Sequence, residues 1–241
     1  MKPTGLLIAL SAPSALALVY DEWSFDKIPD AGLDDITFPF NVATAPHKTG
    51  FYFAQQFNFK NLPSVGYTGV QPREDKGGAS ILHFVFSTFQ NGSTTTDSKR
   101  CKPGADGGPG VSCAIEMPAD YKHNYQMKVK NVGGTTCRGS VIDVTAKGKE
   151  MTVGEWTLPK KGGKIQRSQV GFVEYYPWNG RPSHKCRDLP KTEATFGHPT
   201  SSTAGARGGR TKKPVENGDC VGKAGFSVTE VKDGWKVKVG F

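Results

Sequence analysis

The chain has 241 residues, a formal net charge of +9 and a hydrophobic content of 36%. This length supports one large hydrophobic core, and all-β domains of this size often stay undivided, so we expect a single domain. Thirty glycines and sixteen prolines fall between short apolar runs, which argues against a helical protein and favours β-strands joined by turns.

The first twenty residues, MKPTGLLIALSAPSALALVY, have the order of a secretory signal. The positive charge of Lys2 is followed by an apolar run from Leu6 and by small residues up to Ala17. Because this run is too short and too interrupted for a membrane span, we predict a signal peptide over residues 1–18 and a secreted mature domain over residues 19–241.

Short segments with alternating side chains follow at close intervals. GFYFAQQFNF, for example, places Phe51, Phe53, Phe57 and Phe59 on one face, as expected for a strand with one buried side. The expected strands cover residues 36–42, 50–59, 65–72, 79–89, 124–132, 138–146, 150–159, 168–180 and a closing hairpin at 226–241 that turns at Asp233-Gly234. One-sided strands must bury their apolar faces against another layer, which predicts an all-β fold: an antiparallel two-sheet β-sandwich of jelly-roll or concanavalin-like type with long loops. The Gly-, Lys- and Arg-rich segment 193–217 is predicted to be a flexible basic loop.

Secretion makes the five cysteines disulfide candidates. We predict the pairs Cys101–Cys113 and Cys186–Cys220, because each would close a Gly-rich segment and so constrain the unfolded chain. Cys137 is then left over, and its pairing with Cys113 stays an open alternative. No CxxC or His-rich spacing indicates zinc, so no metal site is predicted.

Two loops carry further candidates. The sequon Asn91-Gly92-Ser93 predicts N-glycosylation of Asn91 in a turn. The stretch ADGGPG, residues 105–110, could hold a calcium ion together with the nearby Asp97. A turn closed by a disulfide is the alternative for that stretch, and no other cofactor is predicted.

The order of several motifs resembles one family. FYFAQQFNF, GYTGVQPRE, ILHFVFSTF, YQMKVK, EWTLP and GFVEYY occur in this order over residues 38–176, with a Gly-rich loop among them. They resemble the secreted family called domain of unknown function 3472. The resemblance implies a concanavalin-like β-sandwich, often found with carbohydrate-associated partners, and it implies no particular reaction.

The stretch SQVGFVEYYPWNG, residues 168–180, contains the clearest candidate site. Alternation along a strand would put Glu174, Tyr176 and Trp178 on one face. On an exposed face, the rings could stack on sugars while Glu174 accepts hydrogen bonds from their hydroxyls. On an inner face, the rings would be packing and Glu174 would need a donor. The candidate ligand-binding residues are Tyr67, Gln71, Arg73, Glu174, Tyr176 and Trp178.

We therefore expect a secreted protein that binds a glycan or another cell-surface or cell-wall polymer, as an effector or adhesion factor. No pair of acids occurs at the strand spacing that a sandwich hydrolase often uses, so binding is preferred over catalysis. A carbohydrate-active enzyme is one alternative, either a hydrolase using Glu174 or a polysaccharide lyase using Tyr67 with Arg73. The positive charge leaves a third hypothesis open, a basic toxin that acts on nucleic acid or membrane, and makes an anionic polymer a possible partner.

Overall fold

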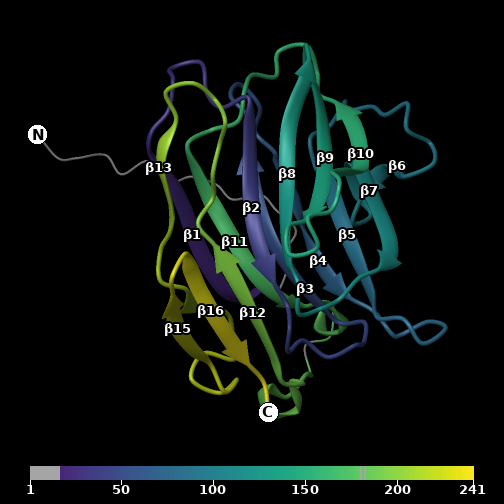
Figure 1. Ribbon diagram of the computed structural model, residues 1–241, viewed down its shortest axis with the longest axis vertical. Coiled ribbons are helices and arrows are strands. Elements are labelled where there is room, and N and C mark those ends of the chain that lie inside the picture. The colour runs from purple at the N-terminus through teal and green to yellow at the C-terminus, as the bar shows by residue number, and fades with distance from the viewer. Residues whose placement is uncertain (1–16, 180, 182) are drawn as a thin grey trace, which may run out of the picture.

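The computed structural model describes residues 17–179, 181 and 183–241, which form two packed antiparallel β-sheets (Figure 1). The first sheet has the strand order β13 (Arg207–Thr211), β1 (Ala17–Lys27), β11 (Ser168–Tyr175), β3 (Phe51–Asn58), β4 (Val65–Pro72), β5 (Ile81–Thr88), β7 (Gly108–Pro118) and β6 (Cys101–Ala105), with β14 (Val215–Glu216) also pairing to β1. The second sheet has the order β10 (Met151–Thr157), β9 (Thr136–Asp143), β8 (Asn124–Gly133), β2 (Asp35–Asn41), β12 (Thr192–Gly197), β16 (Gly234–Val239) and β15 (Ser227–Val231). Two 3-10 turns, η1 (Tyr176–Trp178) and η2 (Cys186–Asp188), are the only helical segments of the described chain. The predicted all-β sandwich is confirmed.

Aromatic side chains hold the two layers together. Phe53, Phe57 and Phe86 of the first sheet are completely buried. From the second sheet, Trp156 stacks on Phe86 with ring centroids 4.6 Å apart. Aromatic pairs in this geometry add to the large stabilisation that the burial of each ring supplies.

The opposite side of the first sheet carries a separate, smaller cluster of side chains. Its buried members are Ala17, Tyr52, Ala54, Tyr67, Val85 and Phe172. All of them belong to strands of the first sheet and alternate with residues of the main core. Because successive side chains of a strand point to opposite faces, this cluster lies on the face turned away from the second sheet. We call it the outer face.

Several strands lie where the sequence predicted a loop or a leader. Segment 193–217 contains most of β12 together with β13 and β14, so the prediction of a flexible loop is wrong. Phe196 explains the difference, since it is buried in the core and packs on Phe40 with centroids 5.5 Å apart. The predicted signal peptide lies outside the described residues except for Ala17 and Leu18, the first residues of β1.

The end of β11 also differs from the expectation. The strand stops at Tyr175 and a 3-10 turn follows, so the alternation expected through Trp178 is wrong beyond that point. Trp178 is buried in the main core, where its ring stacks on His184 at 4.4 Å. In the closing hairpin Val231 pairs with Gly234, which moves the two-residue turn from Asp233-Gly234 to Lys232-Asp233.

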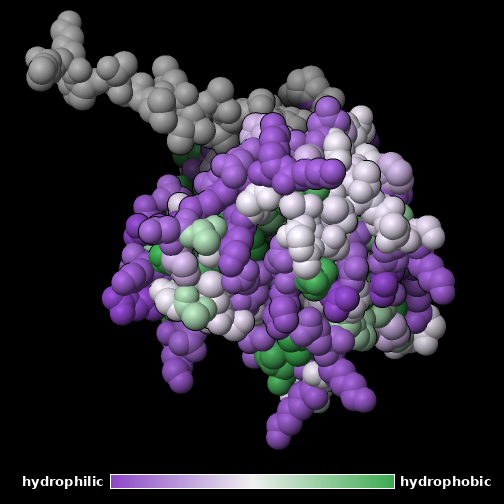
Figure 2. Space-filling view, turned by 90° about the horizontal axis from the view of Figure 1, so that it is seen from above, coloured by the Kyte–Doolittle hydropathy of each residue, from purple (hydrophilic) through white to green (hydrophobic). Residues whose placement is uncertain are grey.

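The disulfides Cys101–Cys113 and Cys186–Cys220 are both present, as predicted. Cys137 is buried and unpaired, which excludes its pairing with Cys113. Structural disulfides of this kind fit an oxidising, extracellular environment. No helix among the described residues is long and apolar enough to cross a membrane. Seen from above, the surface is mostly hydrophilic, with small separate hydrophobic patches (Figure 2).

Candidate functional site

Glu174 lies on the outer face near the end of β11, opposite Tyr52 of β3. The residue is only 6% exposed, and its carboxylate accepts a hydrogen bond from the Asn179 side chain. Burial raises the pKa of Glu174 above its ordinary value, the Asn179 hydrogen bond opposes this, and the negative charge of Asp106 raises the pKa further. A buried acid with a raised pKa beside an open pocket is a candidate general acid.

Asp106 approaches the same place from the β6–β7 hairpin. Ala105 pairs with Gly108, so Asp106 and Gly107 form a two-residue turn in which both have positive φ, 47° and 78°. Such Asp-Gly turns are typical of tight hairpins because their twist matches that of the strands. The Tyr67 hydroxyl donates a hydrogen bond of 3.2 Å to Asp106 Oδ2. The turn therefore brings a second carboxylate to the pocket that contains Glu174.

Two phenols face these acids. The Tyr52 hydroxyl is buried without a hydrogen-bond partner in the part of the chain that the structure describes. Burial raises the pKa of Tyr52 and of Tyr67 well above the ordinary value, and the charge of Asp106 adds to the effect for both. Both hydroxyls keep their protons at physiological pH and are hydrogen-bond donors. Tyr67 is for this reason poorly suited to be the base of a lyase.

Arg73 forms hydrogen bonds with side chains of two strands, β4 and β7. Its guanidinium donates to Gln71 Oε1 at 2.7 Å and to Glu116 Oε2 at 3.2 Å. The bond to Oε1 leaves the Nε2 of Gln71 as the end that can donate to a ligand. His83 lies opposite both Gln71 and Glu116, and burial, followed by the charge of Arg73, lowers the pKa of His83 to about 4. His83 is therefore neutral above that pH.

Together these residues line a groove made of two adjoining cavities of about 360 and 430 Å³. The first is lined by Tyr52, Gln56, Tyr67, Gln71, Arg73, Phe89, Asp106, Phe172, Glu174, Tyr176 and Asn179. The second shares Tyr67, Gln71 and Asp106 with the first and adds side chains of β5, β6 and β7. We call the two cavities the outer-face groove. Their volumes are in the range of small-molecule sites, and their mixture of rings and amides suits a polar ligand.

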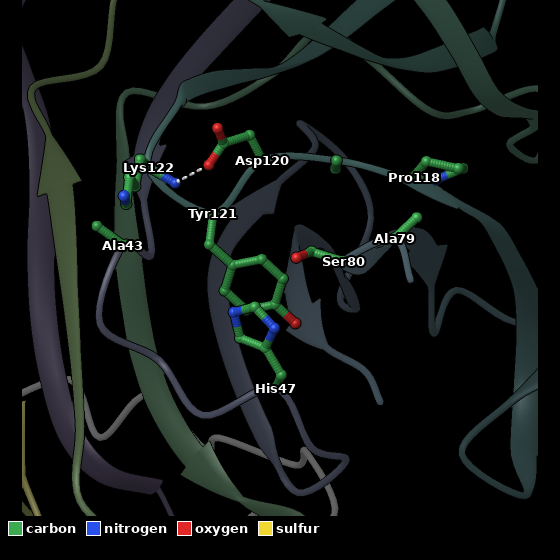
Figure 3. Close-up of a pocket in the computed structure, with 9 residues that line it drawn as sticks. Ala43, His47, Ala79, Ser80, Pro118, Asp120, Tyr121 and Lys122 are labelled. Carbon is green, nitrogen blue, oxygen red and sulfur yellow. Dashed lines mark hydrogen bonds between the residues drawn. The ribbon is translucent and has the colours of Figure 1, made fainter. Parts of the chain in front are cut away.

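A third cavity, of about 480 Å³, opens beside Tyr121 and His47. Their rings stack with centroids 3.9 Å apart, as Figure 3 shows. Two of its polar side chains already have partners: the Tyr121 hydroxyl donates to Ile81 O at 2.9 Å, and Asp120 accepts from the Lys122 backbone. Although this cavity is larger, we place the candidate site in the outer-face groove, which has the perturbed acid and the unpartnered hydroxyl.

The groove brings together five of the six residues that the sequence singled out as ligand-binding, Tyr67, Gln71, Arg73, Glu174 and Tyr176. Tyr176 is anchored there, because its hydroxyl accepts a 2.8 Å hydrogen bond from Gly50 N. Trp178 does not reach the groove, as described above. Sequence reasoning missed Gln56, Asn179 and the role of Asp106, although the Asp-Gly pair is a recognisable hairpin signal.

Other sequence-based candidates lie elsewhere. Asp97 is paired with Arg100 at 2.7 Å, while Asp106 turns towards Tyr67, so these two acids do not form one calcium cluster. Among the described residues, His184, Cys186 and Cys220 have ligand atoms close enough to hold a metal ion, but the two cysteines are bonded to each other. Asn91 is exposed in a turn, where the predicted glycan would be accessible.

No family model matches the chain, and no curated protein is similar to it in sequence. The resemblance to domain of unknown function 3472 therefore stays a prediction. Among solved structures, the chain is similar to scytalido-glutamic peptidase with a transition-state analogue inhibitor, at 10% identity, a TM-score of 0.48, and coverage of 93% of this chain and 98% of that one.

It is also similar to SCP-B, a member of the eqolisin family of peptidases, at 10% identity and a TM-score of 0.42, covering 93% of this chain and 98% of that one. The CBM2 module of the evolved Dit of Lactobacillus casei BL23 phage J-1 has 13% identity and a TM-score of 0.29, covering 62% of this chain and 66% of that one. None of these similarities assigns an activity to this chain.

Proposed function

We propose that the chain is an extracellular hydrolase that cleaves a glycan bound in the outer-face groove, with Glu174 as the proton donor. The observation that carries this proposal is the pair of carboxyl groups in one pocket, the buried Glu174, whose pKa is raised, and Asp106. Glycosidases use two carboxyl groups whose surroundings separate their protonation states, one as acid and one as base or nucleophile.

The proposed reaction uses these two carboxyl groups. Glu174 donates its proton to the oxygen of the leaving sugar as the glycosidic C–O bond breaks. Water attacks the anomeric carbon and forms the new C–O bond, and the Asp106 carboxylate takes the proton of that water. Exchange with solvent then returns a proton to Glu174 and removes one from Asp106. The hydrogen bond from Tyr67 to Asp106 holds the second carboxylate in place.

The lining of the groove favours a sugar. Tyr176 and Phe89 offer ring surface at the pocket that holds Glu174, while Gln56, Gln71 and Asn179 offer amide donors and acceptors. Sugar rings present an apolar face and a rim of hydroxyl groups, which this combination complements.

Glycan binding without turnover, as an effector or adhesion factor, is the second candidate function. The observation that favours it is the hydrogen bond from Asn179 to the Glu174 carboxylate, which holds this group as an acceptor for a sugar hydroxyl. The same groove would then serve as the binding site, so both functions depend on the same residues and differ in whether product forms.

The test measures sugar release from a panel of soluble wall polysaccharides between about pH 4 and pH 7, with a peptide substrate as a separate arm. Replacement of Glu174→Gln is expected to lower the rate by about 10²-fold or more while leaving glycan binding in place. The wild-type rate should fall as pH rises through the raised pKa of Glu174.

Glu230→Gln is the matched control, since Glu230 is exposed on β15 of the second sheet. Undiminished glycan cleavage by the Glu174→Gln variant would refute the catalytic role. Glycan binding without product by the wild type would favour the second candidate. Cleavage of the peptide alone, or binding of no glycan, would rule out both.

A further inference from the structure

The half of the outer-face groove that lies away from Glu174 is basic. Lys99, Arg100 and Lys102 all line this second cavity, next to the residues that it shares with the first. Arg100 is paired with Asp97 at 2.7 Å. Neither lysine forms an ion pair with a carboxylate in the described residues, so two positive charges at this end remain available for a ligand.

Lys102 is carried by an anchored hairpin, and Lys99 lies in the turn just before that hairpin. Lys102 pairs with Ser112 of β7, and Cys101 pairs with Cys113, to which it is disulfide-bonded. Cys101 points into the main core, so alternation directs Lys102 to the outer face. Ordering these side chains on binding therefore does not require ordering the backbone that carries them.

A buried hydroxyl lies at the same place. Ser87 is completely buried on β5 and lines the second cavity. Its Oγ forms no regular hydrogen bond among residues 17–179, 181 and 183–241, although it lies close enough to the Tyr67 hydroxyl to lower the pKa of Tyr67. An unpaired buried hydroxyl is costly unless a ligand or water satisfies it. It can donate one hydrogen bond into the cavity, as a carboxylate would require.

The remaining charged groups near the cavity give the junction of the two cavities a different charge from the lysine end. Asp106 carries a negative charge at the junction of the two cavities, and Glu116 is held by Arg73 and Lys76. His83 is neutral above about pH 4 and adds no charge. An anionic group is therefore repelled from the junction and attracted to the lysine end.

We propose that this end of the groove is a subsite for the carboxylate of a uronic acid, so that the substrate is an acidic polysaccharide. Lys99 and Lys102 supply the positive charge, and Ser87 Oγ donates a hydrogen bond. The inference rests on the proposed glycan binding and adds the class of sugar. The uronate would lie beside the bond that is presented to Glu174 and Asp106.

The test uses two probes with the same number of sugar units, a hexamer of galacturonic acid and its fully methyl-esterified form, in which neutral methyl esters replace the carboxylates. The wild type is expected to bind the acid about fivefold to tenfold more tightly at low salt, which is the effect of two solvent-accessible ion pairs. The double variant Lys99→Gln/Lys102→Gln should bind both probes with the affinity that the wild type has for the ester. Ser87→Ala should weaken binding of the acid more than binding of the ester, because a carboxylate accepts a stronger hydrogen bond than an ester carbonyl.

Lys160→Gln/Lys161→Gln is the matched control, because it removes the same charge from a loop that does not line the groove. Equal binding of both probes by the wild type, or an equal loss in the control, would overturn the uronate subsite and leave glycan binding intact. Binding of neither probe or of any neutral glycan would refute the proposed function itself. Equal binding of a hexamer of glutamic acid would overturn the assignment to a sugar.

Discussion

Asp21 is an acid buried in the sandwich, and only one of its two oxygens is satisfied. Gln55 Nε2 donates to Asp21 Oδ2 at 2.6 Å, while Asp21 Oδ1 and Gln55 Oε1 have no partner within the described chain. A Cβ built on Gly171 would lie 2.1 Å from that Oδ1 and 2.4 Å from that Oε1. Both oxygens therefore lie close to the Cα of Gly171. A proton on Oδ1 lets Asp21 donate to Gln55 and satisfies both groups.

The pH dependence of stability follows from this pair. Burial raises the pKa of Asp21 from 3.8 to about 7, and hydrogen bonds oppose part of this shift. Between these values the folded state holds a proton that the unfolded state has released, so the free energy of unfolding falls as pH rises from about 4 to about 7. The full effect is on the order of 4 kcal/mol.

Asp21→Asn is expected to abolish most of this slope, because an amide donates to Gln55 at every pH. Urea unfolding between about pH 4.5 and pH 8 measures it, and the exposed Asp30→Asn is the control. An identical slope in the Asp21→Asn variant and the wild type would show that Asp21 is not protonated in the folded protein.

At the scale of elements, the sequence predicted strands well where one face alternates clearly and poorly where the pattern is masked. β3, β4 and β5 were predicted within about two residues. β7 was missed because glycines and a proline begin it, and β1 because its exposed residues include acids that resemble a loop.

The candidate site was only partly predictable for a related reason. Alternation indicates which residues share a face but not which face is buried, so it leaves open whether Glu174 lies on an inner or an outer face. The strands that form the groove are also far apart in sequence, and strand order cannot be obtained from local patterns. Asp106 and Glu174, for example, line one cavity although β3, β4 and β5 separate β11 from the β6–β7 hairpin in the sheet.

The contact between β10 and the β6–β7 hairpin makes a prediction at this scale. A Cβ on Gly154 would lie 2.4 Å from Cys113 Cβ and 2.6 Å from the sulfurs of Cys101 and Cys113. A disulfide cannot yield to such a contact, so Gly154→Ala should cost about 1–3 kcal/mol of folding stability. Chemical denaturation measures this cost.

Gly108→Ala is the control, since its added Cβ would meet only Ala105 O at 3.4 Å. A Gly154→Ala variant as stable as the control would mean that β10 can move away from the disulfide without loss.

At the scale of the whole molecule, the two disulfides constrain different parts of the fold. Cys186 lies between β11 of the first sheet and β12 of the second, and Cys220 lies between β14 of the first and β15 of the second. Their bond therefore ties together two connections that cross from one sheet to the other. Cys101–Cys113 joins two neighbouring strands of one hairpin beside the outer-face groove.

Removal of Cys186–Cys220 should mainly lower global stability, whereas removal of Cys101–Cys113 should also change the geometry of the groove. The sequence separations of 34 and 12 residues correspond to losses of about 4 and about 3 kcal/mol in the chain-entropy estimate. We therefore expect Cys186→Ala/Cys220→Ala to unfold at lower urea concentration than Cys101→Ala/Cys113→Ala. Binding of a uronic acid hexamer, measured well below either midpoint, should weaken only in the Cys101→Ala/Cys113→Ala variant, because only that change releases the hairpin that carries Lys102. The reverse order of stabilities, or equal loss of binding in both variants, would contradict this division between the two bonds.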